Sequence, residues 1–116
     1  MYNYNKLKAE ECEFVAVASE DEIQPGERLF VEIDQFSIVI FNLAGQYYAI
    51  ADLCSHDGGP LGDGDIDGNE IICPRHGARF DMRTGMVLSL PAVEDIPAYP
   101  VQVVDGEIQV GIPLEE

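Results

Sequence analysis

The sequence has few basic residues, few histidines and no long hydrophobic run, and each shortage excludes a class of protein. No apolar stretch approaches the roughly 18 residues of a membrane-spanning helix. The N-terminal segment MYNYNKLKAEECEF lacks the apolar centre of a secretory signal. We therefore expect a soluble, cytoplasmic protein that makes no contact with a membrane.

Basic residues are too scarce for a protein that binds nucleic acid. Six Lys and Arg stand against 22 Asp and Glu, and the formal net charge is −16. Such a charge repels phosphate backbones and anionic lipids. It suits partners with a basic docking face, because complementary charge speeds encounter, although acidity can also serve solubility alone.

The three cysteines are too few for a disulfide framework. Cys12 lies alone near a predicted strand, where we expect a small buried side chain without a functional role. Cys54 and Cys73 lie in one short stretch that also holds both histidines of the chain.

Short alternating segments joined by glycine turns predict an all-β fold. A length of 116 residues suits a single domain, here residues 1–116. Segments 6–13 and 19–24 have some helical character but no sustained apolar stripe. Short strands at close spacing favour an antiparallel sandwich or barrel. The expected strand segments are 11–18, 27–34, 37–52 with a turn at 42–45, 66–73 with a turn at Asp67–Gly68, 78–90 with a turn at 83–85, and 99–112 with a turn at Asp105–Gly106.

The middle of the chain differs from its flanks. Residues 52–91 are rich in glycine and contain few apolar runs, whereas residues 11–51 and 92–113 carry most of the strand pattern. We therefore expect a small lobe inserted into a β base. A glycine-rich lobe buries little apolar surface, and a metal centre would hold it together.

The candidate ligands are Cys54-x-His56 and Cys73-x-x-His76. Thiolate and imidazole together bind zinc, iron–sulfur clusters or copper. Zinc sites usually pair like ligands, as C-x₂₋₄-C and H-x₃₋₅-H. The mixed pairs here suit a two-iron cluster in which one iron takes both thiolates and the other takes both imidazoles. Zinc in the same cage stays open as an alternative.

With Pro74 and Gly77 in the sequence CPRHG, this motif resembles that of the Rieske [2Fe–2S] family. The resemblance implies one cluster per chain, with Cys54 and Cys73 on one iron and His56 and His76 on the other. It also implies a Rieske-like antiparallel β-sandwich base with a small inserted cluster-binding lobe. The histidines would lie at the tip of that lobe and give electrons a short path to a partner.

The residues near the ligands separate this chain from one branch of the family. Rieske proteins of respiratory complexes carry two further cysteines, joined as a disulfide between the cluster loops, and a Ser and a Tyr whose hydroxyls donate hydrogen bonds to sulfur. Gly59, Arg75, Ala78 and Phe80 occupy those positions here. Since hydrogen bonds to sulfur stabilise the added electron, their loss lowers the reduction potential. We expect a potential toward the low end of the roughly −150 to +300 mV Rieske range.

The stretch CPRHGARFDMRTGMVLSLPA resembles the ferredoxin components of bacterial aromatic-ring-hydroxylating dioxygenases. This resemblance implies an electron carrier, not an enzyme, and a monomer. It would take single electrons from an NAD(P)H-dependent flavoprotein reductase and pass them to a terminal oxygenase. Both histidines are used by the cluster, so no 2-His-1-carboxylate site remains, and no glycine-rich nucleotide fingerprint is present.

Three other functions stay open at this point. The chain is compatible with a Rieske-like small subunit of an assimilatory nitrite reductase or another redox enzyme complex. It is also compatible with a structural zinc protein, and with a redox sensor or an accessory to cluster assembly.

The residues around the ligands carry further expectations, which follow from loop geometry and from the resemblance. Glycines should allow a tight loop backbone, with N–H groups free to bond to sulfur. Apolar residues should shield the cluster, pack beneath it or cover it from a third loop. Two arginines should pair with nearby carboxylates and not serve docking. The glycines are Gly58, Gly59 and Gly62. The apolar residues are Pro60 and Leu61 as the shield, Phe80 beneath the cluster and Pro91 in the third loop. The arginines are Arg75 and Arg79, with Asp57, Asp63 or Asp81 as their partners.

Overall fold

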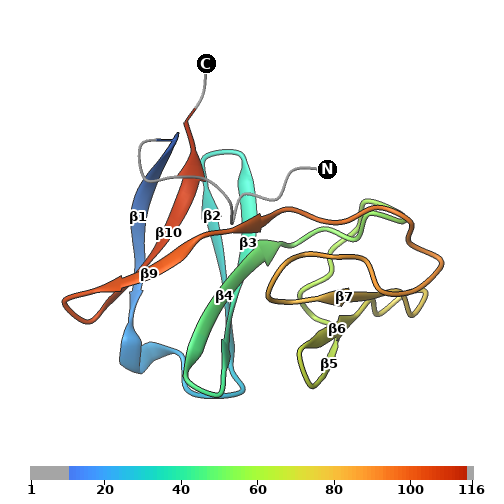
Figure 1. The fold of residues 1–116 in the computed structure, drawn as a ribbon, viewed down its shortest axis with the longest axis horizontal. Helices are drawn as coiled ribbons and strands as arrows, with labels where there is room; N and C mark the ends of the chain where they lie inside the picture. Colours follow the sequence, from blue (N-terminus) through green and yellow to red (C-terminus); the bar gives the residue numbers. More distant parts are fainter. Residues whose placement is uncertain (1–10, 115–116) are drawn as a thin grey trace.

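The computed structural model describes residues 11–114, which form three antiparallel β-sheets (Figure 1). A short 3₁₀ helix, Glu20–Glu22, follows the first strand. The strands are β1 (Cys12–Ser19), β2 (Arg28–Ile33), β3 (Phe36–Leu43), β4 (Gln46–Ala51), β5 (Asp65–Asp67), β6 (Glu70–Ile72), β7 (Arg79–Asp81), β8 (Ala98–Tyr99), β9 (Val101–Val104) and β10 (Glu107–Pro113).

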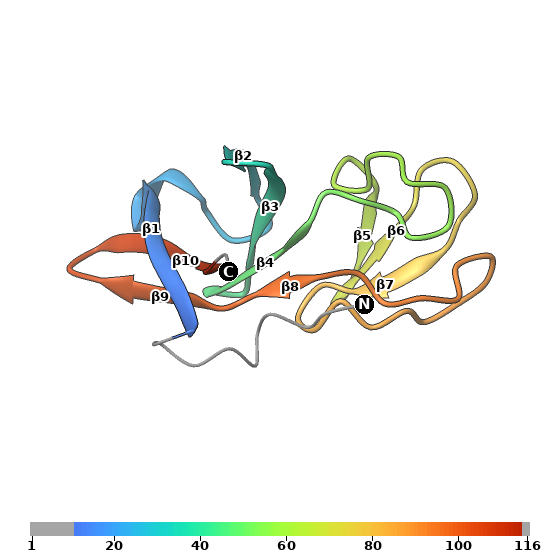
Figure 2. The same ribbon diagram turned by 90° about the horizontal axis from the view of Figure 1, so that it is seen from above.

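Two of the sheets form a base and the third forms a lobe beside it. The base has strand orders β1-β10-β9 and β2-β3-β4-β8, and the lobe has the order β5-β6-β7. Figure 2 shows the base on the left and the lobe on the right, with β4 and β8 leading from one to the other. The chain therefore leaves the base at the end of β4 and returns to it at β8.

Strand β3 contributes side chains to two apolar cores, one inside the base and one between the base and the lobe. Ile38 and Ile40 belong to the core inside the base, whereas Val39 and Phe41 belong to a second core on the side of the lobe. Successive side chains of a strand point to opposite faces. Because both faces are buried, the sequence of β3 reads as a continuous apolar run and not as an alternation.

The second core attaches the lobe to the base. Leu61, Ile71 and Phe80 are fully buried against the β3 side chains Val39 and Phe41. Each buried side chain of this size contributes about 1.5–3 kcal/mol of transfer free energy. This core lies directly beneath the residues that lead into the predicted ligand loops.

The all-β fold and most predicted strands are confirmed. The turn at Asp105–Gly106 joins β9 to β10, with φ of 52° and 80° at the two residues. The third sheet spans Asp65–Asp81 and lies inside the predicted lobe 52–91. The assignment of one domain to residues 1–116 stays a prediction. Among residues 11–114, no helix has the length and apolar character that crossing a membrane requires.

The two segments with some helical character differ in outcome. Segment 19–24 forms a single 3₁₀ turn, Glu20–Glu22, as its lack of a sustained apolar stripe predicted. In segment 6–13, residues 12 and 13 pair with β10 and belong to the predicted strand 11–18, while residues 6–10 lie outside the described residues.

The predicted strand 78–90 is also only partly formed. It contains β7 and a single bridge from Phe80 to Val87. Two backbone hydrogen bonds join its arms: the Asp81 N–H donates to the Met86 carbonyl oxygen at 2.9 Å, and the Leu88 N–H donates to the Arg79 carbonyl oxygen at 2.8 Å. The Arg79 N–H donates to Ser89 Oγ at 3.1 Å and not to the backbone of the opposite arm.

Candidate metal centre

The first predicted ligand loop begins at Cys54, just after β4. The Cys54 N–H donates to the Gly59 carbonyl oxygen at 2.8 Å, and the Gly58 N–H donates to the Cys54 carbonyl oxygen at 2.7 Å. Gly58 has a φ of 75°, a left-handed conformation that glycine adopts without steric cost. The loop 54–59 is therefore closed on itself by two backbone hydrogen bonds.

The second loop, 73–78, has the same pattern. The Cys73 N–H donates to the Ala78 carbonyl oxygen at 2.7 Å, and the Gly77 N–H donates to the Cys73 carbonyl oxygen at 3.0 Å. Gly77 has a φ of 79°. The chain thus builds the same loop twice, once after β4 and once between β6 and β7.

The two loops bring the cysteine thiols together. Cys54 and Cys73 are 0% and 1% exposed, and their side chains are within hydrogen-bonding distance of each other. Burial raises the pKa of Cys54. Burial also opposes ionisation of Cys73, but the Arg75 N–H and the neighbouring Cys54 thiol outweigh it and lower the pKa of Cys73. Such an environment suits a metal-bound thiolate.

The imidazoles lie closer to the surface than the thiols. The rings of His56 and His76 are perpendicular, with centroids 4.9 Å apart. Both histidines are exposed, and half of the His76 side chain is accessible to solvent. The structure therefore brings the four predicted ligands together across the two loops, as a buried thiol pair and an exposed imidazole pair.

The arrangement of the donors suits two metal atoms. The two thiols form a buried pair and the two imidazoles form an exposed pair. A structural zinc ion takes four ligands tetrahedrally around one point. A pair of sulfur donors and a separate pair of nitrogen donors instead match a dinuclear centre, with sulfur on one metal and nitrogen on the other.

A carboxylate and a guanidinium from the base hold the chain that follows the first loop. Asp52 Oδ1 accepts hydrogen bonds from the N–H groups of Leu61 at 2.9 Å and Gly62 at 2.7 Å. Arg28 Nη1 donates to the carbonyl oxygens of Gly62 at 2.5 Å and Gly64 at 2.8 Å. The sequence analysis missed both supports, because a lone Asp or Arg gives no sign of partners this distant along the chain.

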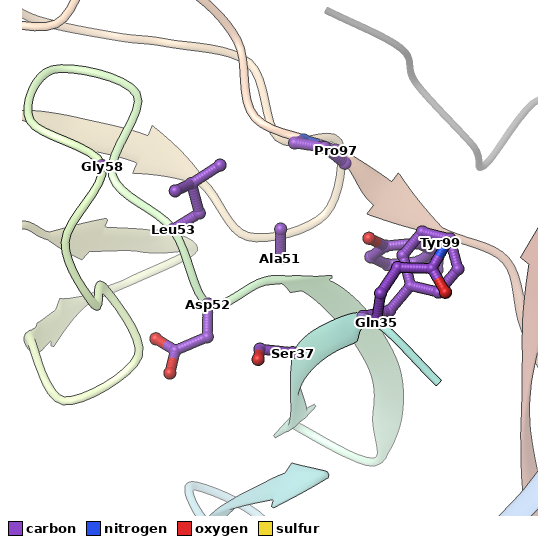
Figure 3. A pocket seen from close by; sticks show the side chains of 9 residues that line it. Gln35, Ser37, Ala51, Asp52, Leu53, Gly58, Pro97 and Tyr99 are labelled. Atoms are coloured by element: carbon purple, nitrogen blue, oxygen red, sulfur yellow. The ribbon is translucent and has the colours of Figure 1, made fainter. Parts of the chain in front are cut away.

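An open pocket of about 410 Å³ lies beside this region (Figure 3). Asp52, Leu53 and Gly58 line one side, and Pro97 and Tyr99 line the other. None of the four predicted ligands lines it, so it is separate from the candidate metal centre.

A third segment, around Pro91, lies alongside the first loop. Ser55 Oγ donates to the Glu94 carbonyl oxygen at 2.5 Å. Within this segment Pro91 is half-buried, whereas Leu90 and Val93 are 76% and 75% exposed. The segment around Pro91 therefore contacts the first loop and leaves an apolar edge open to solvent.

Both arginines near the loops are paired locally, as predicted. Arg75 Nε lies 2.6 Å from Asp57 Oδ2. Arg79 Nη1 lies 3.0 Å from Asp67 and 3.1 Å from Glu70, and the sequence analysis named neither of these two partners.

The expectations for the smaller neighbours are met in part. Leu61 and Phe80 are fully buried as predicted, but Pro60 is exposed. The predicted donation of glycine N–H groups to sulfur is wrong for the bonds described. The N–H groups of Gly58, Gly59 and Gly62 donate to oxygen atoms, and the Cys54 sulfur instead accepts from the N–H groups of His56 and Asp57.

Comparisons with known proteins agree with this geometry. Residues 13–100 match the family model described as the Rieske [2Fe–2S] domain. The chain is 36% identical over 90 residues to the ferredoxin component of the naphthalene 1,2-dioxygenase/salicylate 5-hydroxylase systems of Ralstonia sp., covering 78% of this chain and 86% of the relative.

Two solved structures have the same fold. The ferredoxin of carbazole 1,9a-dioxygenase from Nocardioides aromaticivorans IC177 superposes with a TM-score of 0.79 at 37% identity, covering 84% of this chain and 95% of that chain. A chain in the complex of reduced oxygenase and oxidized ferredoxin of carbazole 1,9a-dioxygenase superposes with a TM-score of 0.80 at 30% identity, covering 89% and 97%.

Replacing Asp52 should loosen the first loop. Asp52→Ala removes a charged acceptor of two backbone N–H groups, each bond being worth about 1.5–3 kcal/mol. We expect faster amide hydrogen exchange at Leu61 and Gly62 and a lower melting temperature. Asp52→Asn keeps an oxygen acceptor, so its exchange rates and melting temperature should lie between those of Asp52→Ala and those of the unchanged protein. Equal exchange rates in Asp52→Ala and the unchanged protein would contradict this role.

Proposed function

This chain belongs to the Rieske [2Fe–2S] domain family, and we propose that Cys54, His56, Cys73 and His76 hold its one cluster. It is a Rieske-type ferredoxin, an electron-transfer protein and not an enzyme. The observation that supports the ligand set best is the meeting of two buried thiols and two exposed imidazoles from loops with the same backbone geometry.

The donor set fits the cluster that the family implies. Cys54 and Cys73 would hold one iron, and His56 and His76 would hold the other. When bound, this group supplies one-electron redox chemistry near the surface. The exposed imidazoles shorten the path to a partner, while the buried thiols lie above the core residues Leu61 and Phe80 and are kept from water.

The surroundings of the sulfur atoms act on the reduction potential in both directions, and we expect the sum to leave it low. Backbone N–H groups at positions 56, 57, 75 and 76 donate to the two cysteine sulfurs and favour added negative charge. Ala78 and Phe80 are fully buried and have no hydroxyl to add to these bonds. The net charge of −16 also disfavours an added electron, although salt screens its exposed part.

We further propose the direction of electron flow. The chain accepts single electrons from an NAD(P)H-dependent flavoprotein reductase and passes them to a terminal oxygenase. Two observations on relatives support the oxygenase: one is a dioxygenase ferredoxin component, and another was solved in complex with its oxygenase. The carrier acts as a cytoplasmic monomer and meets basic faces on both partners.

The other candidate functions have less support. The relatives named above are ferredoxins of dioxygenase systems, which does not favour a small subunit of a nitrite reductase. The division of the donors into a buried thiol pair and an exposed imidazole pair does not favour a structural zinc ion. A ferredoxin of an oxygenase system is the function that the site and the relatives support together.

Variants of the proposed ligands test the site. His56→Ala and Cys54→Ser should each abolish the rhombic Rieske electron paramagnetic resonance (EPR) signal of the reduced protein, because each removes one ligand. Cys12→Ser is the matched control, since Cys12 is a buried cysteine outside the two loops. It should keep the signal. An unchanged signal in His56→Ala would exclude His56 as a ligand.

Electron transfer to an oxygenase tests the proposed partner. The reduced chain is mixed in a stopped-flow instrument with a terminal oxygenase of the naphthalene dioxygenase type. We expect transfer to slow about tenfold or more between about 10 mM and about 1 M salt, as the screening length falls from about 30 Å to about 3 Å. Absence of transfer would contradict the oxygenase partner, and a rate independent of salt would contradict a basic docking face.

A further inference from the structure

An ion pair crosses from one proposed ligand loop to the other. Arg75 Nε donates to Asp57 Oδ2 at 2.6 Å, and Arg75 Nη2 donates to Asp57 Oδ1 at 2.9 Å. Arg75 Nη1 also donates to the Pro60 carbonyl oxygen at 2.6 Å. The planar guanidinium therefore bonds the Asp57 carboxylate bidentately, and its remaining nitrogen donates to the backbone just after the first loop.

The carboxylate of this pair is itself fixed. Asp57 Oδ1 accepts a hydrogen bond from the Gly59 N–H at 3.0 Å, within its own loop. The guanidinium lies directly over Gly59: a Cβ at this position would come within 2.8 Å of Arg75 Cζ. A side chain at position 59 would therefore displace the Arg75 guanidinium from its present place.

The shared loop geometry explains where the pair lies. In the first loop, His56 is the second residue after the cysteine and Asp57 is the third. In the second loop, Arg75 is the second and His76 is the third. The side chain at the second position of each loop therefore contacts the side chain at the third position of the other loop. One contact is the imidazole pair, and the other is the ion pair.

The ion pair also touches the imidazole pair. Asp57 Oδ2 lies 3.6 Å from His76 Nδ1, so the carboxylate is one of the nearest charges to a proposed ligand. A carboxylate and a guanidinium in bidentate contact are both ionised at neutral pH. Each offsets the charge of the other beside His76.

We propose that Asp57 and Arg75 are positioning residues, whose ion pair is a non-covalent clasp that holds the two cluster-binding loops at a fixed spacing and balances charge at the imidazoles. This inference rests on the proposed ligand set. A partly exposed ion pair contributes little to global stability, so its effect is to be measured at the cluster and not in overall unfolding.

Charge balance and loop spacing predict different results for single and double variants. Arg75→Gln leaves an uncompensated negative charge beside His76 and should lower the reduction midpoint. Asp57→Asn leaves an uncompensated positive charge and should raise it. Each change should alter the equilibrium constant for reduction by roughly three- to tenfold. The double variant restores neutrality, and its midpoint should return toward that of the unchanged protein.

The clasp itself is measured by the rate of cluster loss. Bleaching of the visible absorbance at fixed temperature should be about threefold faster or more in Arg75→Gln, in Asp57→Asn and in the double variant, because all three lack the cross-loop bonds. Arg75→Lys keeps the charge but cannot donate bidentately. It should keep the midpoint and still bleach faster.

A matched control removes the same charge from the same lobe. Arg83 pairs with Asp81 at 2.9 Å within a single turn and does not cross between the loops. Arg83→Gln should keep both the midpoint and the bleaching rate. Failure of Arg75→Gln to hold any cluster, with Arg83→Gln fully loaded, would be the extreme form of the expected result.

Two outcomes would overturn the clasp. One is a bleaching rate in the double variant equal to that of the unchanged protein. The other is midpoint shifts of the same sign in Arg75→Gln and Asp57→Asn. Either would leave the proposed function intact, provided that the unchanged protein shows a Rieske signal. Absence of that signal in the unchanged protein would instead contradict the ligand set.

Discussion

The candidate metal centre requires two loops from separate parts of the chain to face each other, because neither loop carries all four predicted ligands. Each loop supplies one thiol and one imidazole, so the four side chains meet only if the ends of β4 and β6 lie close together. The apolar core beneath them, with Leu61, Ile71 and Phe80 against β3, fixes that placement. Asp52 and Arg28 then tie the chain after the first loop to the base.

The two donor pairs lie at different depths, which suits the proposed electron-transfer site. Thiols that are 0% and 1% exposed lie next to the core, where water is excluded. The imidazoles are exposed at the surface, with perpendicular rings. In a chain with a net charge of −16, the charges beside His76 form an internal pair. The tip can thus approach another protein with little local repulsion, while the distant acidic surface guides encounter.

Residue spacing predicted the ligand set because Cys54, His56, Cys73 and His76 are unlike any common zinc pattern. Alternation and glycine turns predicted most strands, including the hairpin at Asp105–Gly106. The strand expected at 86–90 is reduced to one bridge and two backbone hydrogen bonds, since the Arg79 N–H donates to the Ser89 side chain and not to the opposite backbone. The roles of Asp52 and Arg28 depend on contacts between distant segments, which no local pattern records. The opposition of Asp57 and Arg75 depends on loop geometry, and sequence reasoning offered it only as one of several pairings.

An anaerobic redox titration of the purified protein, followed by EPR, tests the account most directly. The account predicts a rhombic Rieske signal that appears only toward the low end of the roughly −150 to +300 mV range of such centres. A midpoint near the high end, strongly dependent on pH, would contradict the interpretation of Ala78 and Phe80 as residues that offer no hydrogen bond to sulfur. No signal at any potential, with stoichiometric zinc by metal analysis, would contradict the electron-transfer function itself.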